Sequence, residues 1–127
     1  MTEASTHDIQ VDVDTRYLSD QSDPEQERFV FSYTITLHNR GNVAARLLSR
    51  KWRITDANGK VQEVEGEGVV GEFPHLDPGE SYRYTSGTII ATPVGSMEGH
   101  YRMEADDGDE FHAPIEAFRL AVPGVIN

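Results

Sequence analysis

The sequence predicts an all-β domain, an immunoglobulin-like antiparallel β-sandwich of seven to eight strands, and three observations support this prediction. Apolar and polar residues alternate in most segments, which is typical of half-buried strands. Turn residues recur about every 8–12 residues, the spacing of β-sandwiches and barrels. No segment shows a convincing helical period of about 3.6 residues. The single tryptophan, on a central strand, favours a sandwich because it would pack between two sheets.

The first two strands are predicted near the N-terminus. Ile9, Val11, Val13 and Tyr17 alternate with polar residues and indicate the first strand. The segment 29–37, with the sequence FVFSYTITL, has the clearest strand pattern in the chain. The polar residues between these two segments predict a loop within one domain.

The third strand is predicted over residues 47–54, with Leu48 and Trp52 on one face and Leu47 on the other. The pair Asn58-Gly59 suits the positive φ angles of a tight hairpin turn. Residues 61–65 then form the returning strand.

The second half continues the same pattern. We expect strands over 81–92 and 101–105, separated by a loop at 93–99. A last strand begins at Phe111 and extends toward Leu120. Pro114 lies within it, so this strand should be an edge strand or be bulged there.

Length and composition exclude several classes of protein. The chain has 127 residues, which corresponds to one domain, and a formal net charge of −11, which disfavours binding to nucleic acid. It has no cysteine, so disulfide scaffolds and thiol catalysis are excluded. Neither a secretory signal nor an apolar run of membrane-spanning length is visible, so we expect a cytoplasmic protein without membrane contact. Both a monomer and a homodimer are compatible with the sequence.

The basic residues are concentrated in one stretch. Residues 38–60 hold six lysines and arginines and one acid, whereas residues 61–80 hold six acids and no lysine or arginine. Two interpretations follow: a solvated acidic surface crossed by a basic strand, or a local site for an acidic partner. Arg50 and Arg53 beside Trp52, together with Arg83, are the candidate partner-binding residues. The alternative is a core tryptophan whose neighbouring arginine pairs with an acid.

The segment from Gly66 to Gly71 matches G-x-G-x-x-G, with its glycines at 66, 68 and 71. A dinucleotide site needs a helix after this motif, and Pro74 and Pro78 prevent one. Two interpretations remain: a structural crossing with a bulge, or a nest of backbone N–H groups that binds pyrophosphate. Glutamates surround the glycines, so the second interpretation requires a divalent cation. Gly66, Gly68 and Gly71 are therefore the candidate ligand-binding residues.

No catalytic set and no specific metal site is predicted. Ser96 is wrongly placed for a nucleophile elbow, and the five histidines lack metal-ligand spacing. His75 near Glu72 and Asp77, or the acidic turn 106–110, would hold a divalent ion only loosely. We therefore expect a protein without enzymatic activity and without a cofactor.

The segment from Gly66 to Met103, GEGVVGEFPHLDPGESYRYTSGTIIATPVGSMEGHYRM, resembles the signature region of the bacterial ApaG family. The segments RFVFSYTITLHNRG and FRLAVP agree with this resemblance. It predicts a disordered N-terminal tail at 1–6, an ApaG domain at 7–123 and a C-terminal tail at 124–127.

The resemblance implies a fibronectin type III-like sandwich and a family without established enzymatic activity. Related domains are fused to an F-box protein and to a DNA-polymerase-delta-interacting protein, where they look like protein-interaction modules. The family is associated with cobalt and magnesium efflux, with diadenosine tetraphosphate hydrolysis and with rRNA adenine dimethylation. We therefore expect a module that binds a protein partner, with pyrophosphate or nucleotide binding at the Gly66–Gly71 turn as the alternative.

Overall fold

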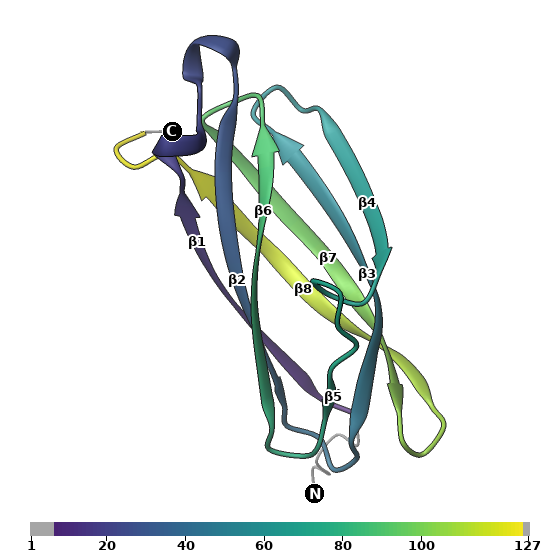
Figure 1. Ribbon diagram of the computed structural model, residues 1–127. Coiled ribbons are helices and arrows are strands. Elements are labelled where there is room, and N and C mark those ends of the chain that lie inside the picture. Colours follow the sequence, from purple (N-terminus) through teal and green to yellow (C-terminus); the bar gives the residue numbers. More distant parts are fainter. Residues whose placement is uncertain (1–6, 126–127) are drawn as a thin grey trace, which may run out of the picture.

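The computed structural model describes residues 7–125, and these form two antiparallel sheets packed face to face (Figure 1). This confirms the predicted β-sandwich. The predicted N-terminal tail at 1–6 and the last two residues of the predicted C-terminal tail lie outside the described residues. The eight strands are β1 (Ile9–Tyr17), β2 (Phe29–Asn39), β3 (Ala45–Asp56), β4 (Val61–Glu67), β5 (His75–Leu76), β6 (Ser81–Ile90), β7 (Val94–Ala105) and β8 (Glu110–Ala121).

The first sheet has the strand order β1-β2-β6, and the second has the order β4-β3-β7-β8, with β5 also paired to β3. Two short 3-10 turns, η1 (Ser19–Gln21) and η2 (Pro24–Gln26), connect β1 to β2. Among the described residues, no helix has the length and hydropathy that crossing a bilayer requires.

The core lies between the two sheets and includes the tryptophan. Trp52 on β3 is 2 % exposed, and its ring lies 5.2 Å from the ring of Tyr33 and 5.9 Å from that of Phe118. The hydroxyls of Tyr84 on β6 and Tyr101 on β7 are 2.5 Å apart and join the two sheets. Burial raises the pKa of both hydroxyls far above the usual range, so both stay protonated.

The two sides of the sandwich differ. On one side β1 contacts β8, which closes the gap between the sheets. On the other side the edges are β6 of the first sheet and β4 of the second, and these edges face each other across an opening (Figure 1). This open side holds the candidate site.

The predicted loop at 93–99 is wrong, because β7 begins at Val94. Its glycines suggested a loop, yet they allow close strand contact. A Cβ at Gly99 would lie 1.9 Å from the carbonyl oxygen of Lys51 on the adjacent strand β3. A Cβ at Gly95 would lie 2.8 Å from the carbonyl oxygen of Thr55. Glycine is therefore the residue that this pairing requires.

The predicted faces of β3 also need correction. Leu47 is fully buried together with Trp52, whereas strict alternation places them on opposite faces. The ladder between β3 and β7 shifts its register between Leu47 and Ser49. This bulge at Leu48 changes which side chains face the core.

The hairpin at residues 56–60 forms as predicted, but with a different turn. Only Gly59 has a positive φ angle, 83°, and its N–H donates to the carbonyl oxygen of Asp56. This is a turn closed by one left-handed glycine, rather than a turn with two positive φ angles. The prediction for Pro114 is confirmed, because β8 is an edge strand and its register with β7 shifts between Met97 and Gly99, opposite residues 115–118.

Candidate functional site

A groove of about 670 Å³ lies at the open side of the sandwich, between β6 and β4. We call it the inter-sheet groove. Trp52 and Tyr33 lie among its lining side chains, with Ile54 and Met97 beside them. Its volume falls within the range of about 300–1,000 Å³ that is usual for binding sites.

The charge of the inter-sheet groove differs from that of the whole chain. Arg28 and Arg50 line it, and no aspartate or glutamate is among the described residues that do. The chain nevertheless has 22 acidic residues against 11 basic ones. The groove is therefore a local cationic site on an anionic protein.

Arg50 is half-buried and holds the glycine-rich segment in place. Its Nη1 donates to the carbonyl oxygens of Glu67, at 3.1 Å, and Gly68, at 2.8 Å. The sequence interpretation paired a neighbouring arginine with an acid, but Arg50 forms no ion pair with any described residue.

Trp52, which lines the groove, has a buried polar group without a partner in the described part of the chain. Its Nε1–H is buried and has no hydrogen-bond partner among the described residues. A buried donor without a partner is unfavourable by about 1–3 kcal/mol. The inter-sheet groove thus includes a residue whose polar group lacks an acceptor.

The glycines of the predicted ligand site have distinct structural roles. Gly66 lies opposite Arg50 in the β3–β4 ladder, and a Cβ there would come within 2.7 Å of the guanidinium. Gly68 has a φ of 62°, and a Cβ there would lie 2.4 Å from the carbonyl oxygen of Glu72. Because Gly66 and Gly68 have no side chains, the Arg50 guanidinium and the carbonyl oxygen of Glu72 can lie close to the backbone of the motif.

The end of the motif is a two-residue turn between Val69 and Glu72, whose backbone groups exchange two hydrogen bonds. Val70 and Gly71 lie at its tip, with φ angles of 47° and 79°. A β-branched residue rarely adopts a positive φ, so the backbone at Val70 is strained. Val70 is also 61 % exposed, whereas Val69 is buried in the core.

The backbone N–H groups of this segment are largely used within the protein. Gly68 N donates to Leu48 O, and Val69 and Glu72 donate to each other. The N–H groups of Val70 and Gly71 have no partner among the described residues. The tip of the motif therefore offers two donors to an added anion.

The three predicted partner-binding arginines do not gather in one place. Arg50 lines the inter-sheet groove, whereas Arg53 lies opposite Glu63 and Glu98 in the second sheet and is exposed. Arg83 is exposed on β6 and does not line the groove. The structure brings Arg50, a predicted partner-binding residue, into contact with Gly66 and Gly68, two of the predicted ligand-binding residues.

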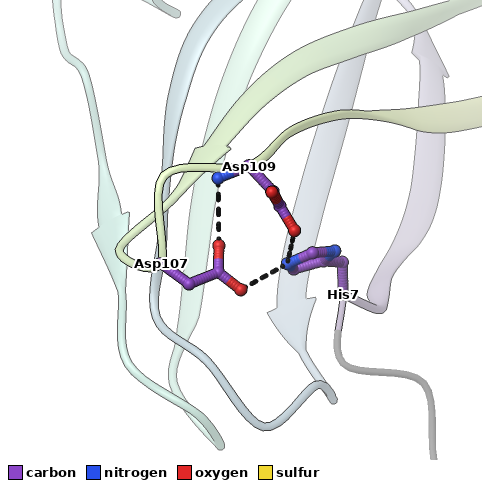
Figure 2. A group of neighbouring side chains, drawn as sticks. All are labelled: His7, Asp107 and Asp109. Carbon is purple, nitrogen blue, oxygen red and sulfur yellow. Dashed lines mark hydrogen bonds and ion pairs between the residues drawn. The ribbon is translucent and has the colours of Figure 1, made fainter.

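A cluster of possible metal ligands lies at the opposite end of the second sheet, near the turn between β7 and β8. Nε2 of His7 lies 3.1 Å from Asp107 Oδ2 and 3.8 Å from Asp109 Oδ2. Figure 2 marks both contacts with dashed lines. The Asp109 N–H and, to a smaller degree, His7 lower the pKa of the Asp107 carboxyl. The sequence singled out the acidic turn but missed His7, because 100 residues separate His7 from Asp107.

The cluster is accounted for without a metal ion. The His7 ring stacks on Phe111 at 4.7 Å, and the ion pair orients its Nε2. His75 lies 2.9 Å from Asp106, and His75, Glu72 and Asp77 do not form a group of possible metal ligands among residues 7–125. In the cluster that does form, the two aspartates are exposed and His7 is partly buried.

A family model described as the ApaG domain matches residues 19–105. Protein ApaG from Stenotrophomonas maltophilia is 54 % identical over 127 residues, which are 100 % of both chains. Protein ApaG from Pseudomonas paraeruginosa is 59 % identical over 121 residues, covering 95 % of this chain and 96 % of its own.

The solved structures agree with these sequence relatives. A crystal structure of an ApaA protein from Bordetella pertussis has a TM-score of 0.93 and 45 % identity, and the match covers 97 % of this chain and 100 % of that one. A protein from Archaeoglobus fulgidus has a TM-score of 0.55 at 8 % identity, which shows a shared fold alone.

Proposed function

Because the chain belongs to the ApaG domain family, we propose that it is a non-enzymatic binding module that holds an acidic segment of a protein partner in the inter-sheet groove. The observation that carries this proposal is the charge of the groove. Two arginines and no acid line it, in a chain with a formal net charge of −11. Charge complementarity therefore selects an acidic partner.

The chemistry of the groove supports binding rather than catalysis. Its polar lining consists of arginine, glutamine, serine, threonine and tyrosine side chains. No histidine or carboxylate is among the described residues that line it, so it holds no usual general base. The resemblance to the family further leads us to expect a cytoplasmic partner linked to cobalt and magnesium efflux.

Two valines on β4 allow a matched test of this proposal. Val64 lines the inter-sheet groove and is 40 % exposed, whereas Val61 is 41 % exposed and does not line it. A photo-crosslinking amino acid at position 64 should capture a discrete protein in cells, which mass spectrometry identifies. The same probe at position 61 should capture none of it.

A second variant tests the role of charge. Ile89→Glu places an acid in the groove and should lower recovery of the captured partner about tenfold, which corresponds to about 1.4 kcal/mol. Val61→Glu is the control and should leave recovery unchanged. Equal capture from positions 61 and 64, or capture unaffected by I89E, would contradict a partner bound in the groove.

The alternative is a module that binds pyrophosphate or a nucleotide at the Gly66–Gly71 turn together with a divalent cation. The free N–H groups of Val70 and Gly71 favour it. Calorimetry with ATP and diadenosine tetraphosphate, with and without Mg²⁺ or Co²⁺, tests it. Heat that depends on the metal ion would support this alternative, and the absence of heat would exclude it.

A further inference from the structure

We propose that the inter-sheet groove recognises a short extended peptide segment through a carboxylate of the peptide that pairs with Arg50. This inference rests on the proposed function and names the chemistry of the partner segment. It assigns the preference for an acid to one residue of β3.

Arg50 has the properties of a residue that binds a carboxylate. Its Nη1 donates to the carbonyl oxygens of Glu67 and Gly68, which orient the guanidinium, and its other N–H groups have no acceptor among residues 7–125. Lys51 and Arg102, by contrast, have the carboxylates of Glu65 and Glu110 at 3.4 and 2.6 Å. A half-buried guanidinium without a counter-ion is suited to a carboxylate, which can accept two parallel hydrogen bonds.

Trp52 makes binding in the groove observable. It lines the same groove and is 2 % exposed, and its buried N–H lacks an acceptor among the described residues. A peptide in the groove therefore changes the surroundings of the indole ring without a hydrogen bond to its N–H.

The shape of the groove favours an extended peptide. Residues 50–54 of β3 extend over about 13 Å at about 3.3 Å per residue, the length of four or five residues of an extended segment. Val64 and Ile89 expose apolar side chains on the two facing edge strands. These edges also have unpaired backbone groups, with which an added strand can form hydrogen bonds.

The experiment selects ligands without assuming their sequence. A displayed library of random seven-residue peptides is panned on the full chain, and enriched peptides are titrated while Trp52 fluorescence is recorded. Trp52 is the single tryptophan of the chain, so its emission reports on the groove directly. We expect enriched peptides to share an aspartate or glutamate, and replacement of that acid by its amide to weaken binding about tenfold or more.

Variants at position 50 test whether the acidic residue of the peptide binds to Arg50. Arg50→Met should bind the acidic peptide and its amide equally weakly, whereas Arg50→Lys should keep part of the preference for the acid. Arg83→Met is the control, because Arg83 lies outside the groove and its loss removes the same charge. Thermal unfolding of each variant establishes that it is folded. A preference for the acid that persists in R50M would overturn the inference.

The outcomes separate this inference from the proposed function. Enriched neutral peptides that change Trp52 emission would leave binding in the groove intact and overturn the carboxylate assignment. A library that yields no binder would overturn the peptide inference, while the crosslinking test at Val64 still decides the proposed function. A response to ATP alone would favour the nucleotide alternative and overturn this inference.

Discussion

At the scale of single residues, the three glycines of the G-x-G-x-x-G segment differ in what surrounds them. Gly66 adjoins a flexible guanidinium, Gly68 adjoins the backbone of Glu72, and Gly71 has open space around it. The sequence pattern treats them as equivalent. Their structural importance depends on what surrounds them, which is Arg50 for Gly66 and Glu72 for Gly68.

This difference predicts unequal effects of alanine at Gly68 and Gly71. Both have positive φ angles, so each substitution should lower the free energy of unfolding by about 1–2 kcal/mol. Gly68→Ala should lose a further 1–3 kcal/mol or so, because its Cβ meets a carbonyl oxygen at 2.4 Å. Urea unfolding measures both, and Gly59→Ala, with a positive φ and open space, should behave like Gly71→Ala. Equal losses at 68 and 71 would contradict the turn geometry.

At the scale of elements, the two sheets are joined by buried polar contacts as well as by apolar packing. One is the hydrogen bond from Asn39 Nδ2 to the carbonyl oxygen of Leu76, and another joins two tyrosine hydroxyls. Tyr84 belongs to the first sheet and Tyr101 to the second, and each is the hydrogen-bond partner of the other hydroxyl. Since both are buried, removal of one hydroxyl leaves the other unsatisfied.

The tyrosine pair predicts that the losses of unfolding free energy in a double-mutant cycle are not additive. Tyr84→Phe and Tyr101→Phe should each lower the free energy of unfolding by about 1–3 kcal/mol, and the double variant should lose less than the sum. Denaturant unfolding of the four proteins measures the coupling. Tyr82→Phe is the control, because the half-buried Tyr82 forms no side-chain hydrogen bond with a described residue. Additive losses would show that the hydroxyls do not depend on each other.

At the scale of the whole molecule, the formal net charge of −11 opposes the folded state through self-repulsion. Salt screens this repulsion, because the Debye length falls from about 30 Å at 0.01 M to about 3 Å at 1 M. The midpoint of thermal unfolding should therefore rise with NaCl, whereas binding of an acidic peptide in the groove should weaken. Calorimetric scans and fluorescence titrations over the same salt series test both directions. A midpoint that falls with salt would show that favourable charge pairs dominate.

Much of the fold could be predicted from local patterns. The alternation in 29–37 and the hairpin at 56–60 gave the correct elements, since side-chain period and turn residues act over a few positions. The errors at 93–99 and at Leu48 share one cause. Gly99 is required by the backbone of Lys51, and the register shift at Leu48 depends on how β3 pairs with β7. Both features depend on contacts with a neighbouring strand, which lies far away in the sequence.

The sequence by itself determined most of the strands, the place of the tryptophan on a central strand and the cationic character of β3, because residue identity and spacing encode these directly. Only the tertiary structure decided that Arg50 lines a groove without acids among the described residues, that the Trp52 N–H has no acceptor among them, and that His7 joins Asp107. The pairing of β3 with β4 and the opening between β4 and β6 create the candidate site. Contacts between residues far apart in the chain arise from sheet packing, and the spacing along the sequence does not encode them.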